Sequence, residues 1–328
     1  MDEPTTITKQ IGKNVEIISI HSHPTSLHIL PRGGRILSVD LGIGNLLWTN
    51  PKIIEVLKRG EWNTGGIRTW ISPEQAFFYN EPQKFGGWRC PPGIDPANYR
   101  VVSKGKRAVE LESTISAKDM ISKETLNGKI RKRFELVEAH QEEGAISARI
   151  RILDFLTVED YHRLFALWTL IQVPTGDESK GKLIVPVVKG AQPIHYFDSI
   201  PESYLEVFEG HVEFTIDGER ELKLGIRPED LPNPREVRME YRFKKNGKNV
   251  LISVFSLTGA KSQDECVDPP KSNPHGMRAV IQSYNSDSKS SGLKFGELEI
   301  QGAKAKKRPD GRLETSEDIT INFTVETS

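Results

Sequence analysis

Cysteines and long apolar runs are scarce in this 328-residue chain. Only two cysteines are present, Cys90 and Cys266, and neither lies in a CxxC pair, which favours two unpaired thiols over a disulfide or a zinc site. No apolar stretch approaches the roughly 20 residues that cross a bilayer. Residues 1–5 are polar, and no apolar segment of a secretory signal follows them. We therefore expect a cytoplasmic protein without a membrane partner.

The chain also lacks a net charge. Lysine and arginine total 45 residues, and aspartate and glutamate total 45 as well, so no overall field attracts nucleic acid or an anionic surface. The basic runs at 129–133 and 304–308 are interpreted as solvated strand and loop positions. We expect no nucleic-acid partner, and no feature of the sequence specifies an oligomeric state.

Helix signals are sparse, whereas strand signals recur from end to end. The best helix candidate is the short segment 51–61, which begins with a proline. Turn pairs such as Asp217-Gly218 and Asn246-Gly247 fall between strand-like runs, which favours antiparallel hairpins. Residues alternate between apolar and polar, as half-buried strands require, at 15–20, 35–41, 108–113, 129–137, 145–152, 212–216, 250–255 and 319–325.

This pattern predicts an all-β protein in which two large, mostly antiparallel sheets face each other. No repeat of about 20 to 50 residues is visible, so a propeller or a solenoid is disfavoured. The proline-rich segment 264–276 is interpreted as a surface loop, because strand patterns resume directly after it. We expect residues 1–328 to form one domain, a large antiparallel β-sandwich.

The segment 63–74 is the first candidate site. It contains two adjacent glycines, which allow a close backbone approach, followed by Arg68, Trp70 and Glu74. A sugar needs this mixture, because pairs of hydroxyl groups suit bidentate donors and acceptors while the apolar ring face suits an aromatic plate. The alternative interpretation is that the tryptophans of this region pack in the core and that Arg68 pairs with Glu74.

A second candidate lies near the C-terminus. In an extended strand, Glu297, Glu299 and Gln301 share one face. Leu298 and Ile300 share the other face. The polar face is either solvated or lines a cavity, where a carboxylate could act as a general base. Both interpretations stay open at this point.

The segment 164–173 is largely apolar and is predicted to be a central strand buried on both faces. Trp168, Thr169 and Gln172 are interleaved in it. Buried threonine and glutamine side chains need hydrogen-bond partners, which a ligand or neighbouring strands could supply. This segment is therefore a third candidate for the site.

Metal and cofactor signals are weak. His21 and His23 alternate on one predicted strand face, with His28 nearby, but their spacing matches no zinc motif. The sequence also lacks a phosphate loop, a GxSxG elbow and an HExxH motif. We therefore predict no metal and no cofactor.

Several segments resemble, in the same order, the aldose 1-epimerase (galactose mutarotase) family. Residues 33–39 and 46–51 are similar to its opening strand and its LLW-NP segment. Residues 65–74 fit a GG-x-R-x-W-x-x-PE pattern of an uncharacterised bacterial and archaeal branch. Residues 298–301 resemble the LE-x-Q strand that carries the family's catalytic glutamate, and 319–325 suits its last strand. The resemblance implies a galactose mutarotase-like β-sandwich with a sugar site on one face.

In that family a glutamate takes the proton of the anomeric hydroxyl while a histidine protonates the ring oxygen. The resemblance makes Glu299 the base and Arg68 a sugar-binding residue, but Trp168 stands where the histidine is expected, within 166–170. Tryptophan cannot replace an acid whose pKa lies near neutrality, and His162 lies about 13 to 20 Å of extended backbone away. We therefore expect saccharide binding with weak or absent mutarotation of glucose and galactose.

Three hypotheses follow. The first is a carbohydrate-binding, mutarotase-like protein, either a binder alone or an enzyme that acts on a sugar or sugar derivative by a modified mechanism. The second is a true aldose 1-epimerase that uses Glu299 with an unidentified acid, and the third is a non-catalytic, partner-binding sandwich. The first requires the arginine, tryptophans and glutamates named above to converge in one cleft, whereas the third predicts that they scatter. With Glu299 as the catalytic residue, the predicted substrate-binding residues are Asn63, Arg68, Trp70, Glu74, Trp88, Trp168, Gln172, Glu297 and Gln301.

Overall fold

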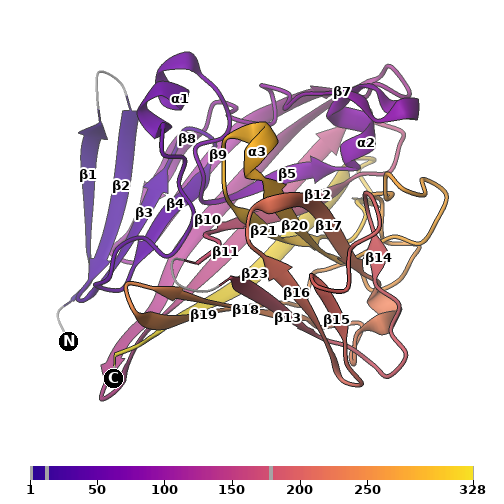
Figure 1. The fold of residues 1–328 in the computed structure, drawn as a ribbon. Helices are drawn as coiled ribbons and strands as arrows, with labels where there is room; N and C mark the ends of the chain where they lie inside the picture. Colours follow the sequence, from indigo (N-terminus) through magenta and orange to yellow (C-terminus); the bar gives the residue numbers. More distant parts are fainter. Residues whose placement is uncertain (1–2, 12–14, 177–179, 328) are drawn as a thin grey trace.

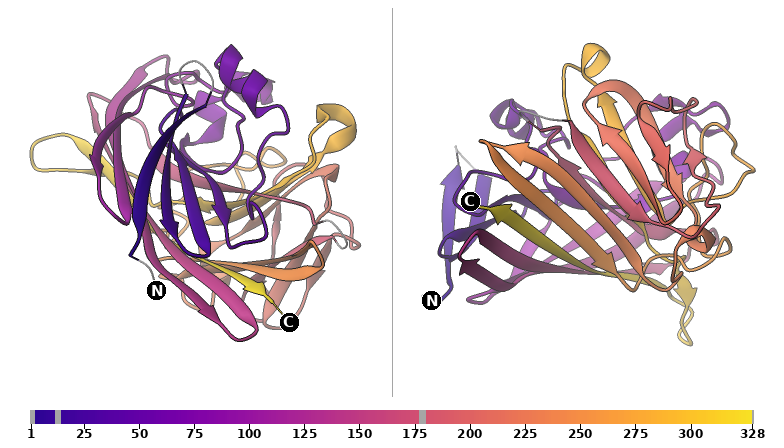
Figure 2. Two further views of the ribbon diagram at one scale, coloured as in Figure 1. Left: turned by 90° about the vertical axis from the view of Figure 1, so that its left-hand side faces the viewer. Right: turned by 60° about the horizontal axis from the view of Figure 1, so that its bottom comes forward.

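Two large β-sheets stacked face to face make up most of the molecule (Figure 1). The structure is a computed structural model that describes residues 3–11, 15–176 and 180–327. Within these ranges, all the strands of both sheets pair in antiparallel fashion. Figure 2 shows the same two layers from two further sides.

The described strands of the first sheet are, in spatial order, β1 (Thr5–Ile11), β2 (Val15–Ser22), β3 (Thr25–Leu30), β4 (Arg35–Asp40), β5 (Ile67–Ser72), β12 (Ala166–Val173), β21 (Gly296–Gln301), β20 (Ile281–Asp287), β17 (Glu219–Ile226) and β14 (Ile194–His195). Those of the second sheet are β15 (Leu205–Val207), β16 (His211–Ile216), β13 (Gly181–Pro186), β18 (Val237–Lys245), β19 (Lys248–Ser256), β23 (Leu313–Glu326), β11 (Ala145–Glu159), β10 (Thr125–Glu142), β9 (Ala108–Lys118) and β8 (Arg100–Lys104), with β22 (Lys306–Lys307) beside β23.

Helices are short in the described part of the chain, and none of them is long and apolar enough to span a membrane. They are α1 (Ile53–Arg59), α2 (Glu74–Phe77), α3 (Ser288–Ser291) and the 3-10 turns η1 (Pro82–Lys84) and η2 (Pro228–Asp230). A separate small hairpin pairs β6 (Tyr79–Glu81) with β7 (Gly86–Trp88).

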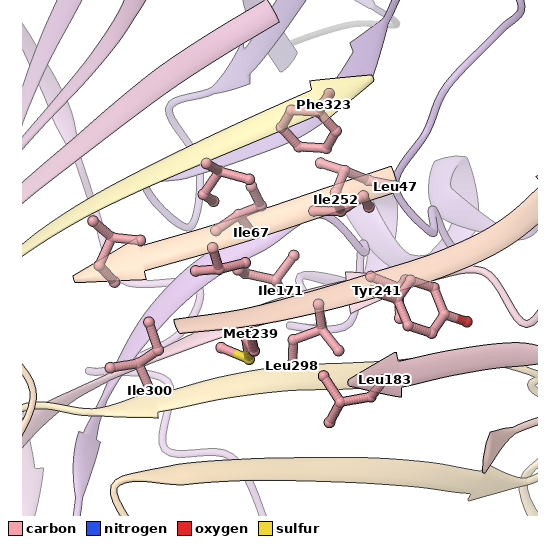
Figure 3. Close-up of a cluster of buried hydrophobic side chains, with 14 of the residues drawn as sticks. Leu47, Ile67, Ile171, Leu183, Met239, Tyr241, Ile252, Leu298, Ile300 and Phe323 are labelled. Carbon is pink, nitrogen blue, oxygen red and sulfur yellow. The ribbon is translucent and has the colours of Figure 1, made fainter. Parts of the chain in front are cut away.

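The main core lies between the two sheets, where the apolar faces of their strands meet. Ile67, Ile171 and Leu298 project from β5, β12 and β21 of the first sheet, and they share a buried cluster with Ile252 and Phe323 of the second (Figure 3). Burial of each such side chain contributes about 1.5–3 kcal/mol. The antiparallel β-sandwich predicted from the alternation is confirmed.

The helix predicted at 51–61 is also confirmed. Helix α1 occupies the middle of this segment and ends at Gly60, whose φ of 75° gives a left-handed C-cap. Strand β12 is buried at every position, as the apolar segment 164–173 predicts.

The prediction of a surface loop at 264–276 was partly wrong. Cys266 and Asp268 are buried, at 0% and 2% exposed. The carboxylate of Asp268 accepts hydrogen bonds from the backbone N–H of Glu74 and from Gln282 Nε2, at 2.7 and 3.2 Å. These bonds hold the first half of the segment against the first sheet.

The strand order of the first sheet determines which parts of the chain meet. Strands β5, β12, β21, β20 and β17 are spatial neighbours, although they come from widely separated regions of the sequence (Figure 1). Side chains that point away from the core on these five strands therefore converge on one surface.

Candidate functional site

A cavity of about 470 Å³ lies on the first sheet, over strands β5, β12, β21, β20 and β17. Glu297 and Glu299 line it, whereas Leu298 between them belongs to the core. The cavity therefore lies on the face of the sheet that points away from the second sheet. Its volume falls in the range of about 300–1,000 Å³ that is typical of small-molecule sites. We call this cavity the cleft.

Aromatic rings and charged side chains share the lining of the cleft. Trp88 is 40% exposed and forms part of the rim, whereas Trp70 and Trp168 are buried deeper. Such a lining can contact a ligand through apolar faces and through hydrogen bonds. The tryptophans are Trp62, Trp70, Trp88 and Trp168. The charged residues are Arg68, Glu74, Glu221, Lys223, Lys271, Glu297 and Glu299.

Two glycines position β5 at the cleft. Gly65 and Gly66 have φ angles of 95° and 82°, which residues with a side chain rarely adopt. A Cβ on Gly65 would lie 2.5 Å from the Trp48 carbonyl oxygen, and one on Gly66 would lie 2.1 Å from that of Ile36. The close backbone approach predicted for this glycine pair is thus present, and it lets Arg68 enter the sheet two residues later.

Arg68 lies on the floor of the cleft and is 1% exposed. Its Nη2 is 2.7 Å from Glu297 Oε1, and its Nε is 4.0 Å from Asp95 Oδ2. The guanidinium carbon lies 4.3 Å from the ring centroid of Trp70 and 5.1 Å from that of Trp62, within the range of cation–π contacts. Nε and Nη1 have no hydrogen-bond partner among the described residues.

Glu299 and Lys223 form a buried ion pair beside this arginine. Lys223 Nζ lies 3.1 Å from Glu299 Oε2, and the two side chains are 4% and 0% exposed. Trp168 Nε1 donates a hydrogen bond to the same Oε2 at 3.0 Å. Within the ranges that the structure describes, Glu299 Oε1 has no hydrogen-bond partner. A charged donor and a carboxylate with an available oxygen therefore lie side by side.

Aromatic rings flank the ammonium group of this pair. Lys223 Nζ lies 4.7 Å from the ring centroid of Trp168 and 5.6 Å from that of Tyr196. Both distances are within the reach of cation–π attraction, which favours the charged form of the lysine. The Tyr196 hydroxyl accepts hydrogen bonds from the Ala279 N–H and from Gln282 Nε2, so its ring is held in place.

Burial and the neighbouring charges together determine the protonation of these groups. It raises the pKa of Glu299 to about 8, although Lys223 opposes the rise. Burial alone would lower the pKa of Lys223, but the carboxylates of Glu299, Glu74 and Asp268 outweigh it and raise that pKa above its ordinary value. Burial also raises the pKa values of Glu74 and Asp268. Near neutral pH the lysine is therefore charged, and the carboxyl groups hold protons more tightly than they do in water.

Glu74 connects the floor of the cleft to its rim. Its Oε1 accepts a hydrogen bond from Trp88 Nε1 at 2.8 Å, and its Oε2 lies 3.8 Å from Lys223 Nζ. Its backbone N–H donates to Asp268, as described above. Glu74 therefore pairs with Lys223, and not with Arg68 as one interpretation of the sequence held.

Most of the residues predicted from the sequence come together in the cleft. Gln172 and Gln301 are corrections: both are fully buried and neither lines it. Gln172 Nε2 donates a hydrogen bond at 3.0 Å to Oε1 of Glu297, which does line the cleft. Strand alternation specifies the face on which a residue lies but not its distance from the centre of a site. The residues that do line the cleft are Asn63, Arg68, Trp70, Glu74, Trp88, Trp168, Glu297 and Glu299.

Five charged residues in or beside the cleft are absent from the sequence-based predictions: Glu221, Lys223, Lys271, Asp95 and Asp268. Lys223 lies between Leu222 and Leu224 on β17, and a single lysine in such an apolar run is a signal that could have identified it. Asp95 and Asp268 lie in loops, where no periodic pattern marks a buried carboxylate. Only the position of Lys223 follows from the order of the strands in the sheet.

Comparison with known proteins identifies a family and a fold. A model of a family of unknown function, DUF6786, matches residues 43–320, whereas no curated protein matches the sequence. A structure from Klebsiella pneumoniae subsp. pneumoniae MGH 78578, provisionally assigned as an aldose 1-epimerase, has a TM-score of 0.52 at 12% identity, over 98% of this chain and 83% of that one.

The galactose 1-epimerase of Lactobacillus acidophilus NCFM has a TM-score of 0.48 at 9% identity, over 99% of each chain. At these identities the likeness concerns the fold alone. The Klebsiella structure confirms that the chain has the galactose mutarotase-like β-sandwich that the sequence resemblance implies.

Proposed function

The chain belongs to the DUF6786 family of unknown function, and we propose that its cleft binds a small-molecule saccharide. A solved structure that shares its fold is provisionally assigned as an aldose 1-epimerase, which supports a sugar as the ligand. The fold alone does not select an activity, so the chemistry of the cleft carries the proposal.

The observation that carries it is the combination of aromatic rings with unused hydrogen-bonding atoms at one place. A pyranose presents apolar C–H faces and a rim of hydroxyl groups, so it needs both. Trp62 and Trp88 offer ring faces near the rim, with their centroids 5.5 Å apart. On the floor, Arg68 has two nitrogens and Glu299 one oxygen without partners among the described residues. Buried polar atoms normally have partners, and sugar hydroxyl groups would supply them.

The second candidate function is aldose 1-epimerization, with Glu299 as the base. The observation that favours it is the ammonium group of Lys223, whose Nζ lies 3.1 Å from Glu299 Oε2. Ring opening needs an acid as well as a base. The third, a partner-binding sandwich without a ligand, is disfavoured by the convergence of the predicted residues in a cleft.

A thermal-shift screen of monosaccharides and disaccharides tests the proposal. A ligand that binds the folded state raises its melting temperature in a saturable way. Sorbitol at the same millimolar concentrations is the matched control, because it has the hydroxyl groups but no ring. We expect at least one cyclic saccharide to raise the melting temperature when sorbitol does not. If no saccharide does so, the partner-binding hypothesis replaces this one.

A further inference from the structure

We propose that Lys223 is the catalytic proton donor of the cleft and that it acts with Glu299 to open the ring of a bound reducing sugar. This inference rests on the proposed saccharide binding and goes beyond it, because it assigns a reaction and a second catalytic group. It also revises the expectation of weak or absent mutarotation, which depended on the lack of a histidine.

The geometry places the two groups where such a pair must be. In a pyranose the anomeric oxygen O1 and the ring oxygen O5 are bonded to the same carbon, C1, so a base and an acid that contact them must lie side by side. Lys223 Nζ and Glu299 Oε2 are 3.1 Å apart, and both residues line the cleft. Proton transfer requires hydrogen-bond distances of about 2.6–3.2 Å. Because the lysine and the glutamate are neighbours, they can contact O5 and O1 of one sugar at the same time.

The two oxygens of Glu299 have different environments. Oε2 receives both donors, Lys223 Nζ and Trp168 Nε1. Oε1 has no partner in the part of the chain that the structure describes and is therefore the atom that can accept a proton. Trp168 fills the position expected for histidine, but its indole N–H only orients the carboxylate. Lysine is then the nearest group with a proton to give.

The proton transfers balance without another reactant. Glu299 takes the proton from O1, the electron pair of that O–H bond forms the C1=O1 double bond, and the C1–O5 bond breaks. The electron pair released on O5 takes a proton from Lys223 Nζ and becomes the C5 hydroxyl. After rotation about C1–C2, both transfers run in reverse and the ring closes as the other anomer.

The surroundings of Lys223 keep its proton in place and exclude a role as a nucleophile. Glu299, Glu74 and Asp268 keep it charged, whereas a Schiff-base lysine must be neutral to attack a carbonyl. Because Glu299 is 0% exposed, the cleft must open slightly over it when a saccharide enters. A single side-chain hydrogen bond connects Trp88 at the rim to Glu74. Because only this bond has to break, we expect these two side chains to move.

The test is anomer exchange followed by NMR, with glucose, galactose, mannose and xylose as probes and with binding measured in parallel by thermal shift. We expect protein-dependent exchange of at least one sugar, reduced about 10²-fold in Lys223→Met while binding remains detectable. Lys223→Arg keeps the positive charge, but its larger, planar guanidinium cannot place a proton where the compact ammonium does. Exchange should therefore stay low in Lys223→Arg although binding recovers.

Lys132→Met is the matched control, because Lys132 is also a buried lysine, 1% exposed and 2.6 Å from Asp154 Oδ2, but belongs to the other sheet. We expect it to lose stability and keep the exchange rate. The rate should rise with pH as Glu299 ionises, near pH 8 in the natural protein. In Lys223→Met that midpoint moves upward, because the cation that lowers the pKa of Glu299 is gone.

Three other outcomes would contradict the inference. Exchange that is as fast in Lys223→Met as in the natural protein overturns the role of Lys223. Sugar binding without exchange of any probe overturns the inference and leaves the proposed function intact. Neither binding nor exchange, for all four sugars, removes the inference and argues against the proposed function as well.

Discussion

The side chains of Arg68 and Glu297, 229 positions apart in the chain, meet at 2.7 Å on the floor of the cleft. Their strands, β5 and β21, are separated in the sheet only by β12. Gln172 of that middle strand donates to the same Glu297 oxygen. The contact therefore ties together the strands that carry the predicted site.

The first prediction concerns this buried pair. Arg68→Met leaves the carboxylate of Glu297 without its cation, whereas Asp95 keeps its ion pair with Arg35. The free energy of unfolding should therefore fall by about 3–5 kcal/mol. Arg151→Met is the control: it breaks an ion pair with Asp318 whose side chains are 45% and 36% exposed, and it should cost about 0–1 kcal/mol. Urea denaturation measures both, and equal losses would contradict this account of the cleft floor.

The second prediction concerns the rim. Trp88→Ala removes an aromatic face that is 40% exposed, so it should weaken saccharide binding about tenfold, or about 1.4 kcal/mol, with little loss of stability. Phe155→Ala is matched, because Phe155 is also 40% exposed and lies on β11, away from the cleft. Calorimetric titration compares them. Unchanged affinity in Trp88→Ala would show that the rim does not contact the sugar.

The third prediction concerns the glycines before β5. Gly66→Ala places a Cβ 2.1 Å from a backbone oxygen at a φ of 82°, whereas Gly144→Ala has a φ of 86° and nothing within 4 Å. Gly144→Ala should therefore cost only the left-handed strain, about 1–2 kcal/mol. Gly66→Ala should cost clearly more and should also weaken saccharide binding, because it displaces Arg68. Similar stabilities for the two variants would show that the close approach is unimportant.

The fourth prediction concerns stability and pH. Glu317 is 1% exposed and accepts a hydrogen bond from Thr169 between the sheets, and burial raises its pKa from 4.5 to about 8. The folded state thus binds this proton more tightly than the unfolded state. Its contribution to stability is complete below about pH 4.5 and is lost as the pH rises through about 8.

Melting temperatures across this pH window provide the measurement. The natural protein should lose stability as the pH rises, and Glu317→Gln should lose less because the ionisable group is gone. Some dependence should remain, since burial raises the pKa of Glu299 in the same direction. A pH dependence that is unchanged in Glu317→Gln would show that this carboxyl group is already ionised in the folded protein.

Residue alternation was sufficient to predict the β-sandwich, because its period specifies which face of each strand is buried. The segment 63–74 and the pair Glu297 and Glu299 could be predicted as a candidate site from their residue types, and they line one cleft. The ion pair of Lys223 with Glu299 was not predictable, because it depends on β17 lying two strands from β21 across β20. Strand order in a large antiparallel sheet arises from long-range pairing, which a local pattern does not encode.

A titration of intrinsic tryptophan fluorescence with saccharides is the most direct test of the central claim that the cleft binds a sugar. Four of the five tryptophans, Trp62, Trp70, Trp88 and Trp168, line the cleft, so a sugar bound there must change their surroundings. We predict a saturable change in emission at the sugar concentrations that raise the melting temperature. A sugar that raises the melting temperature and leaves the emission unchanged would bind elsewhere, and that result would contradict the account.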